Sequence, residues 1–373
     1  MTSTPVLTFS ILTIPEREQY LRRLFASIAA LDGGASARVD VIYNRPLEGA
    51  LSDAIARIRD EAPTLPIDVY FNAGETSISA GRNLQLSVCR TPVIAFVDDD
   101  LSLHGSVVPS ILDTLDAHPV ALVGLPSFDG DTDNRLKPRD STPSVDWRGL
   151  RLSPVQGMLC AGYRALLADV GGFNTRRRFW GEWTELNLRL WRSGFPTAYQ
   201  LDGRAFLRHW RDAPSSPTRN MEGRERHVVW GLICTALEYD AVDISEATEV
   251  FWRLVEDRYL AYSYGDELSP RNVLRTVLEL VPQISAEWSS IQEFRARAAA
   301  HPFSFAPFHR FTMEEVRAVW AHATPAIRVY RAHVARDRAH ANGHARGRRL
   351  RSASVGHALQ RLMRSLRRLR QQV

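Results

Sequence analysis

The first 210 residues alternate between two patterns of hydrophobic and polar positions. Short runs rich in β-branched and aromatic residues are typical of buried strands, whereas apolar residues at helical spacing predict helices. We predict strands at residues 7–14, 39–43, 67–71, 93–97, 120–123, 156–163 and 205–208. We predict helices at residues 16–30, 51–58, 77–88, 104–115 and 185–191, and a loop at 124–145. Strands and helices in this order predict an α/β fold, with a mainly parallel sheet flanked by helices.

The pattern changes near residue 240. Beyond this point helical spacing recurs at residues 250–262, 273–281 and 313–320, without strand alternation. Near the end of the chain, apolar side chains fall on one helical stripe and arginines lie mostly opposite. We therefore expect an α/β domain at 1–239, a helical region at 240–337 and a basic amphipathic tail at 338–373.

Charge separates the tail from the rest of the chain. The net charge is +5, but residues 338–373 hold ten arginines and no acid, so subtracting +10 leaves about −5 for residues 1–337. A basic amphipathic helix suits an anionic membrane surface or a groove on a partner. A terminal helix packed on its own domain, or a disordered tail, is the alternative. The acidic body carries no nucleic-acid motif, so we expect no nucleic-acid partner.

The composition is that of a soluble globular protein, with 45% hydrophobic and 24% charged residues. Three widely spaced cysteines form neither a metal pattern nor a disulfide framework, which favours a reducing compartment. We find no secretory signal and no apolar run that could span a bilayer. We therefore expect a cytoplasmic protein, with peripheral contact at the inner face of the membrane if the tail binds lipid. Only one of the 47 basic residues is a lysine, which we attribute to a GC-rich bacterial genome.

Three consecutive carboxylates, Asp98, Asp99 and Asp100, follow the apolar run Val93 to Val97. In open parallel sheets, ligands bind outside the carboxyl ends of the strands. Adjacent carboxylates repel one another unless a cation neutralises them, and oxygen ligands suit Mg²⁺ or Mn²⁺. The alternative is a solvated acidic turn.

The first half of the chain resembles an inverting glycosyltransferase of the GT-A fold, most similar to glycosyltransferase family 2. The resemblance covers about residues 7–230 and depends on motifs in a fixed order. These are Ser10 to Arg17, Asn72-Ala73-Gly74 with Gly81-Arg82-Asn83, Phe96 to Asp100, Gly171-Gly172-Phe173, Gly181-Glu182 with Leu188-Arg189, and His209. The resemblance implies transfer of a sugar from a nucleotide-diphosphate donor, with UDP-sugars favoured, to an unidentified acceptor.

The family also implies roles for particular residues. Asp98, Asp100 and His209 would bind Mn²⁺ or Mg²⁺, with Asp98 or Asp99 facing the ribose. The nucleotide-sugar would contact Thr13, Pro15, Arg17, Asn44, Gly74, Arg82, Asp98, Asp99 and Arg219. Asn44 departs from the family, because an aspartate is usual after this second strand. The nucleobase that the site prefers therefore stays open.

The catalytic base is the larger departure. An inverting transferase needs a carboxylate to deprotonate the acceptor hydroxyl, but Trp183 stands at the usual position. Glu182 is our first candidate for the base and Glu185 the second. Alternatively both are structural, capping the helix or pairing with Arg189. The protein is then a retaining enzyme, activates its acceptor through another group, or is a non-catalytic scaffold or sugar-binding protein.

One alternative activity is disfavoured, whereas the role of the helical region and the nature of the acceptor stay open. A nucleotidyltransferase is disfavoured, because Thr13 to Glu16 contain none of the glycines of a phosphate-binding loop. The helical region would cover the acceptor site, form a homodimer or dock to a membrane that carries a lipid-linked acceptor. The acceptor itself could be a glycan, a lipid-linked sugar or a small molecule.

Overall fold

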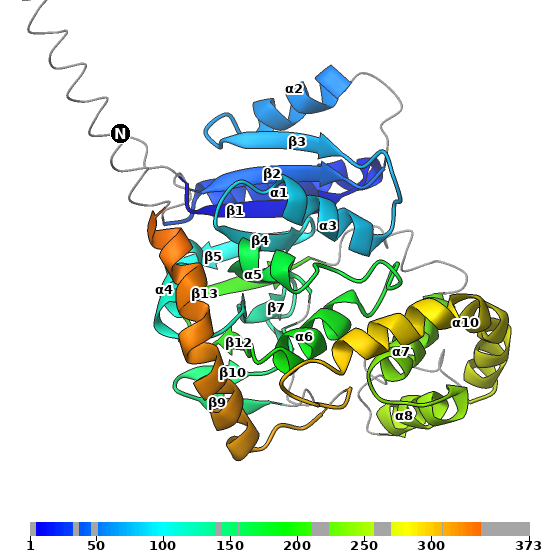
Figure 1. Cartoon of the computed structure of the whole chain (residues 1–373). Helices are drawn as coiled ribbons and strands as arrows, with labels where there is room; N and C mark the ends of the chain where they lie inside the picture. The colour runs from blue at the N-terminus through cyan, green and yellow to red at the C-terminus, as the bar shows by residue number, and fades with distance from the viewer. Residues whose placement is uncertain are drawn as a thin grey trace, which may run out of the picture.

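The computed structural model describes residues 5–32, 37–45, 51–138, 144–155, 157–210, 224–256, 270–307 and 309–336. Two sheets and the surrounding helices form the α/β part, and a group of helices lies beside it (Figure 1). The predicted donor-binding Arg219 and the tail at 338–373 lie outside the described residues, so their roles stay predictions.

The large sheet has the strand order β3-β2-β1-β4-β11-β6-β12-β10-β9. Its members are β1 (Leu7–Thr13), β2 (Arg38–Tyr43), β3 (Ile67–Phe71), β4 (Val93–Asp98), β6 (Leu122–Gly124), β9 (Val145–Trp147), β10 (Leu150–Leu152), β11 (Leu159–Tyr163) and β12 (Thr197–Gln200). The small sheet has the order β5-β13-β7-β8, with β5 (Leu101–Gly105), β7 (Ser127–Asp129), β8 (Arg135–Lys137) and β13 (Ala205–His209).

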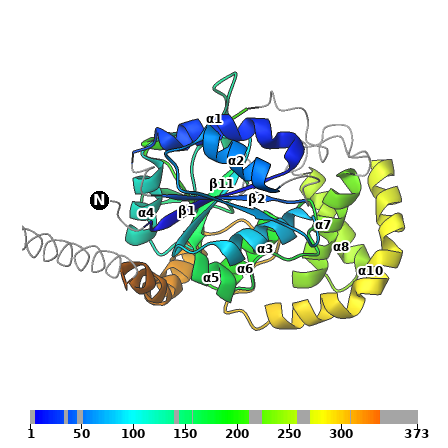
Figure 2. The ribbon, with the colours of Figure 1, turned by 90° about the horizontal axis from the view of Figure 1, so that it is seen from above.

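Helices cover both faces of the large sheet, with α1 and α2 on one face and α3, α5 and α6 on the other (Figure 2). The first helices are η1 (Pro15–Arg17), α1 (Glu18–Ala29), α2 (Leu51–Glu61), α3 (Ile78–Val88) and α4 (Val107–Ala117). The later ones are α5 (Arg164–Asp169), α6 (Glu182–Arg192), α7 (Arg224–Tyr239), α8 (Ile244–Glu256), α10 (Pro270–Ala298) and a helix at 313–336. The predicted α/β class is confirmed.

The sheet is mixed, and this corrects its predicted mainly parallel character. Strands β3, β2, β1 and β4 are parallel, but β11 is antiparallel to both β4 and β6. Leu159 at the start of β11 pairs with Val97 at the carboxyl end of β4, and Tyr163 at the end of β11 pairs with Val93. Because β11 begins at that carboxyl edge, it must run back in the opposite direction.

Two local predictions need correction. The helix predicted at 104–115 is α4, which begins only at Val107, because residues 104 and 105 end strand β5 and Gly105 has φ of 76°. The segment predicted as a loop at 124–145 contains β7 and β8. Both errors concern β5, β7 and β8 of the small sheet, which have three to five residues and show no clear period, whereas β13 matches the strand predicted at 205–208.

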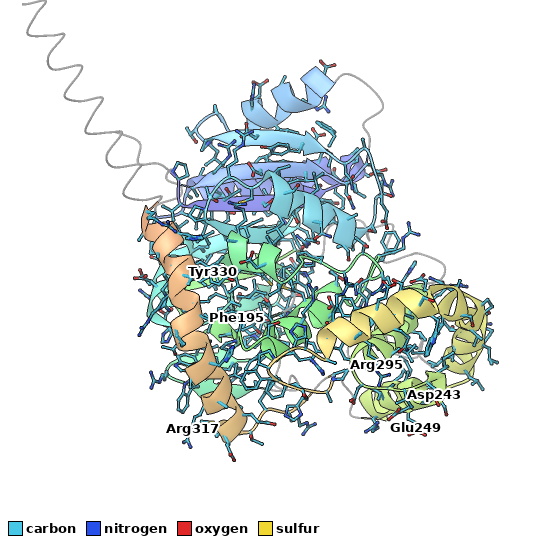
Figure 3. All side chains as sticks on the ribbon, in the orientation of Figure 1. Phe195, Asp243, Glu249, Arg295, Arg317 and Tyr330 are labelled. Atoms are coloured by element: carbon cyan, nitrogen blue, oxygen red, sulfur yellow. The ribbon has the colours of Figure 1, made fainter. Side chains whose placement is uncertain are left out.

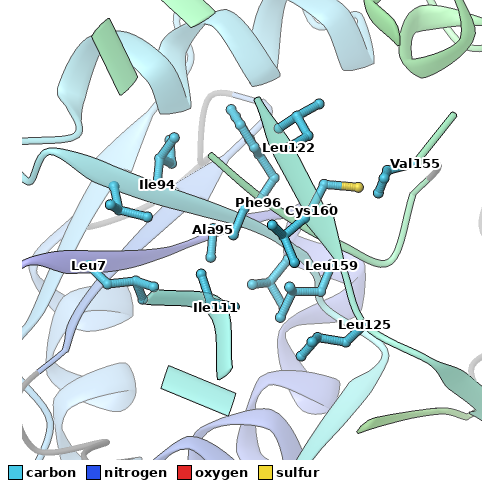
Figure 4. Packing of buried hydrophobic residues seen from close by; sticks show 14 of the residues in the cluster. Leu7, Ile94, Ala95, Phe96, Ile111, Leu122, Leu125, Val155, Leu159 and Cys160 are labelled. Atoms are coloured by element: carbon cyan, nitrogen blue, oxygen red, sulfur yellow. The ribbon is translucent and has the colours of Figure 1, made fainter. Parts of the chain in front are cut away.

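The hydrophobic core lies between the large sheet and its helices. Strand β4 is apolar from Val93 to Val97 and every one of these residues is buried, as expected of a strand covered on both faces. Ala95 of β4, Leu159 of β11 and Ile111 of α4 all belong to this core (Figure 4). The core therefore fixes the strand that ends in the three aspartates.

The later helices divide between two cores. Helices α7, α8 and α10 form a second core of their own, which contains Ile233, Phe251 and Leu280. Helix 313–336 instead packs on the first core, where Tyr330 contacts Phe195 at 6.3 Å between ring centroids (Figure 3). Helix α7 thus packs with the helical group, although its residues fall on the α/β side of the predicted boundary at 239. In the described part of the chain, no helix combines the length and apolar character needed to cross a membrane.

Candidate active site

The three aspartates lie at the carboxyl edge of the large sheet, beside the end of β1. Parallel pairing places Leu12 of β1 opposite Asp98 of β4, so Thr13 and helix η1 adjoin the acids. The antiparallel pairing of β5 and β13 brings His209 opposite Leu101, one residue after Asp100. Residues from three distant parts of the chain therefore meet at this edge.

Asp99 is 4% exposed, and its carboxylate is bound by Thr13 and Arg17. The Thr13 hydroxyl donates to Oδ2 at 2.7 Å, and Arg17 Nε donates to both carboxylate oxygens at 2.9 Å. Burial raises the pKa of Asp99 to about 6, because the loss of solvation outweighs the charge and hydrogen bonds of Arg17. The predicted donor-site residues Thr13, Arg17 and Asp99 thus form one hydrogen-bonded group, which Pro15 adjoins at the start of η1.

Asp100 lies between Arg17 and His209. Its Oδ2 is 2.8 Å from Arg17 Nη2 and 3.3 Å from His209 Nε2. Burial alone would raise the pKa of Asp100, but hydrogen bonding and charge from His209 and Arg17 lower it to about 2. His209 is 7% exposed, and its Nδ1 is buried without a hydrogen-bond partner among the described residues.

Asp100 and His209 fit two adjacent positions around a divalent cation. Octahedral Mg²⁺ with bonds of 2.0–2.1 Å places neighbouring ligand atoms about 3 Å apart, close to the distance between Asp100 Oδ2 and His209 Nε2. Two protein ligands leave the remaining positions for phosphate oxygens and water. Within the residues that the structure describes, no three His, Cys, Asp or Glu side chains gather around one point.

Asp98 turns away from this pair. Its Oδ1 accepts a hydrogen bond from Arg82 Nη2 at 2.5 Å, and its Oδ2 accepts one from the Met158 amide at 3.0 Å. The structure therefore brings together two of the three predicted metal ligands, and the place of Asp98 in the metal shell stays a prediction. Sequence reasoning missed the Met158 amide, since a backbone donor at φ of 57° leaves no sequence signal.

Arg82 lies beneath Trp183 in a buried aromatic group. The guanidinium carbon is 5.6 Å from the centre of the Trp183 ring, within the range of a cation–π contact. Trp183 also meets Phe173 at 4.9 Å and Phe96 at 5.5 Å, both edge to face. The tryptophan at the family's usual base position is thus a packing residue that supports Arg82.

The residues predicted near the nucleobase form a hydrogen-bonded network that holds the loop before α3. The Asn44 amide donates to the Thr76 and Ser77 carbonyl oxygens at 3.0 and 3.1 Å. Asn44 Oδ1 accepts from Asn72 Nδ2 at 2.8 Å, and Asn72 Oδ1 accepts from the Gly74 amide at 3.0 Å. Asn44 therefore holds the loop before α3 and shapes the donor side indirectly, while its contact with a base stays a prediction.

The close fit beside this loop explains the glycine of the Gly81-Arg82-Asn83 motif. A Cβ atom at Gly81 would lie 2.7 Å from Leu12 Cδ1 and 2.8 Å from Asn44 Oδ1. Only a glycine lets α3 approach β1 closely enough to place Arg82 beside Asp98.

The two candidate bases have different environments. Glu182 is half-buried at the start of α6, and burial raises its pKa, opposed by the nearby charge of Arg82. Glu185 is fully buried, and Arg189 donates to both of its oxygens at 2.9 and 2.7 Å. Tyr239 donates to the same carboxylate at 2.5 Å. The geometry therefore favours Glu182 as the base and gives Glu185 a structural pairing.

Comparisons with known proteins agree with the fold and motifs. Residues 11–179 match the family model of glycosyl transferase family 2. A search of curated protein sequences finds no match. Among solved structures, residues 1–349 of S. aureus TarS in complex with UDP-GlcNAc superpose with a TM-score of 0.52 and 11% identity. That superposition covers 93% of this chain and 92% of the TarS chain.

Two further structures are less similar. The mannosyltransferase PcManGT from Pyrobaculum calidifontis, in complex with GDP-Man and Mn²⁺, gives a TM-score of 0.47 and 16% identity over 80% of this chain and 87% of its own. GalNAc-T7 with UDP, GalNAc and Mn²⁺ gives a TM-score of 0.46 and 14% identity over 70% of this chain. The present chain covers 58% of GalNAc-T7.

The fold is that of the GT-A class of glycosyltransferases. Residues 11–179, less than half of the chain, are similar to glycosyl transferase family 2.

Proposed function

We propose that this protein transfers a sugar from a UDP-sugar to an acceptor hydroxyl, that the reaction depends on Mn²⁺ or Mg²⁺, and that it inverts the anomeric centre. The observation that carries the proposal is the pair formed by Asp100, in the turn between β4 and β5, and His209 at the end of β13, whose side chains lie 3.3 Å apart. A divalent cation held there would neutralise charge on the departing diphosphate. TarS, which shares the fold, was solved with UDP-GlcNAc, so UDP-sugars are the first donors to test.

The residues around this pair would bind and orient the donor. Thr13 and Arg17 hold the carboxylate of Asp99, which by resemblance to the family is, with Asp98, one of the two candidates that would face the ribose. Arg17 also reaches Asp100, so one guanidinium keeps two adjacent carboxylates in a fixed arrangement. Arg82 similarly holds Asp98. This side of the site would therefore need little rearrangement to receive a nucleotide.

Glu182 would accept the proton of the acceptor hydroxyl. A carboxylate whose pKa is raised by burial binds a proton more strongly, which favours general-base catalysis near neutral pH. Its position at the start of α6 places it near the charges of Arg82 and Asp98 on the donor side. The acceptor would then lie between the aspartates and α6.

Calorimetric titration of UDP and GDP, each with Mn²⁺, Mg²⁺ or EDTA, tests the donor and the cation together. We expect UDP binding that requires the cation and that Asp100→Asn abolishes, while Asp116→Asn on the exposed face of α4 leaves it unchanged. Absence of UDP binding under every condition would refute the UDP-sugar proposal. The anomeric configuration of the product, determined by NMR, separates an inverting from a retaining reaction.

One observation favours a non-catalytic scaffold as the second candidate. Trp183 stands at the family's usual base position, and its indole cannot accept a proton, because Nε1–H is a donor only. A scaffold would bind the nucleotide without turnover, whereas the proposed enzyme releases UDP from its donor. A cytoplasmic location, contact of the tail with a membrane and homodimer formation stay predictions.

A further inference from the structure

The segment 174–181 links the donor side of the site to helix α6. It follows the Gly171-Gly172-Phe173 turn and ends at Gly181, which precedes the proposed base Glu182. The segment has no regular secondary structure, so side-chain contacts must fix its path. We call residues 174–181 the acceptor loop, and the inference below depends on the proposed function.

Glu238 on α7 binds three side chains of the acceptor loop. Arg176 Nε donates to Oε1 at 2.8 Å, Arg177 Nη2 donates to Oε2, and Asn174 Nδ2 lies 3.2 Å from Oε1. Arg177 and Glu238 are both 0% exposed. Because water cannot replace the carboxylate at a fully buried guanidinium, the path of the loop depends on Glu238.

Other groups on α7 reinforce this contact. Thr235 Oγ1 accepts from Arg177 Nε at 3.2 Å, and Trp230 Nε1 donates to the Arg176 carbonyl oxygen at 2.9 Å. A Cβ atom at Gly231 would lie 2.8 Å from the Trp180 carbonyl oxygen, so only glycine allows the loop to pass this close. Helix α7 therefore contacts the loop at its backbone as well as at its side chains.

The other side of the acceptor loop contacts α3, which carries Arg82. The Ile78 amide donates to the Arg178 carbonyl oxygen at 2.7 Å, and the Ser79 hydroxyl donates to the Arg177 carbonyl oxygen. The loop thus lies between the start of α3 and α7. Figures 1 and 2 show that α7 also contributes to the helical group that stands beside the α/β part.

Two consecutive residues of α7 contact the chain on both sides of Glu182, the proposed base. Glu238 binds the acceptor loop before Glu182, and Tyr239 donates to Glu185 on the first turn of α6. We propose that Glu238 is a positioning residue. Through it, the helical group fixes the path of the acceptor loop and therefore the position of Glu182 relative to the donor.

The test compares Glu238→Asp with Leu280→Ala in the full-length protein. Glu238→Asp keeps the buried charge but withdraws the carboxylate by one methylene, whereas Leu280→Ala weakens the same helical core through an apolar side chain. We would measure hydrogen exchange of the 174–181 amides, the UDP affinity with Mn²⁺, the melting temperature and the rate of UDP release from UDP-GlcNAc and UDP-glucose in water.

For Glu238→Asp we expect faster exchange in the acceptor loop and turnover reduced about 10²-fold, because misplacement by about 1 Å has that effect. UDP affinity should stay within about twofold, since the aspartates and His209 are untouched. Leu280→Ala should lower the melting temperature and leave turnover and loop exchange near those of the wild type.

Unchanged loop exchange in Glu238→Asp would overturn the anchoring, and unchanged turnover with a loosened loop would overturn the positioning role. An equal loss of turnover in Leu280→Ala would show that the loss in Glu238→Asp comes from lower stability, and this would also overturn the positioning role. If the wild type binds no UDP, the proposed function fails first and the positioning role falls with it, while the exchange data still report whether Glu238 holds the loop.

Discussion

Substitution of Glu185 by glutamine should cost folding stability. In the wild type the Glu185 carboxylate is fully buried, receives two hydrogen bonds from Arg189 and one from Tyr239, and carries the charge opposite the Arg189 guanidinium. Glutamine keeps the volume but removes the charge, so a buried cation loses its partner.

The structure sets the size of the effect. Breaking a buried ion pair costs about 3–5 kcal/mol, and the lower figure applies because Arg189 keeps hydrogen bonds to the Val170 and Gly172 carbonyl oxygens. Each kcal/mol shifts the melting temperature of a large domain by about 2 °C. We therefore expect Glu185→Gln to lower the melting temperature by about 6 °C.

The same pair predicts a dependence on pH. Burial alone would raise the pKa of Glu185, but the charge and hydrogen bonds of Arg189 and the hydrogen bond of Tyr239 outweigh it and lower the pKa. A lowered folded-state pKa gives stability that is present above the unfolded value of about 4.3 and disappears as the pH falls through the folded value. The gap between wild type and variant should be full at pH 7 and should narrow below about pH 4.

Thermal melts monitored by circular dichroism from pH 3.5 to 8 measure this gap. Glu182→Gln is the matched control, since the same change on the same helix removes no ion pair recorded in the structure, and it should melt within about 1 °C of the wild type. If Glu185→Gln melts like the wild type at pH 7, or if the gap does not depend on pH, Glu185 does not stabilise the fold as described.

Three further predictions concern the site and the turn beside it. Glu182→Gln should reduce UDP release by about 10²–10⁴-fold at unchanged UDP affinity, and normal turnover would exclude this glutamate as the base. His209→Ala should raise the Mn²⁺ concentration needed for half-maximal UDP binding at least about tenfold, because one of two proposed protein ligands is lost; an unchanged calorimetric titration would contradict the proposed metal shell. Gly105→Ala should destabilise the fold by at least about 1–2 kcal/mol in denaturant melts, since φ is 76° and the new Cβ would lie 2.1 Å from the Arg204 carbonyl oxygen. A wild-type midpoint would show that the turn relaxes.

The sequence pattern predicts six strands of the large sheet, β1, β2, β3, β4, β6 and β11, because their signals are local. Strand β4 is a continuous apolar run, and the helices that flank the sheet carry apolar residues at regular spacing, so each can be recognised without its neighbours. The ordered motifs likewise locate the aspartates, Arg82 and the start of α6. The three-residue strands β7, β8, β9 and β10 escape prediction because strands this short acquire their partners only in the folded chain.

The roles of the two glutamates could not be predicted from sequence. Glu182 and Glu185 both lie in the first turn of α6 and look equivalent by spacing. In the structure, Arg189 and Tyr239 donate hydrogen bonds to Glu185 and not to Glu182. Tyr239 is 54 residues away, and its approach depends on how α7 packs beside α6. A pairing between residues so distant in sequence is a property of the packing and leaves no local pattern.

The sequence by itself determined the α/β class, the strand that presents three carboxylates and the presence of a histidine after a late strand, because each depends on residues that are neighbours in the chain. Only the tertiary structure decided which side chains meet. It brought Asp100 beside His209, paired Asp98 with Arg82 and placed Glu238 against the acceptor loop. The physical reason is that strand register and helix packing set the distances between residues far apart in sequence.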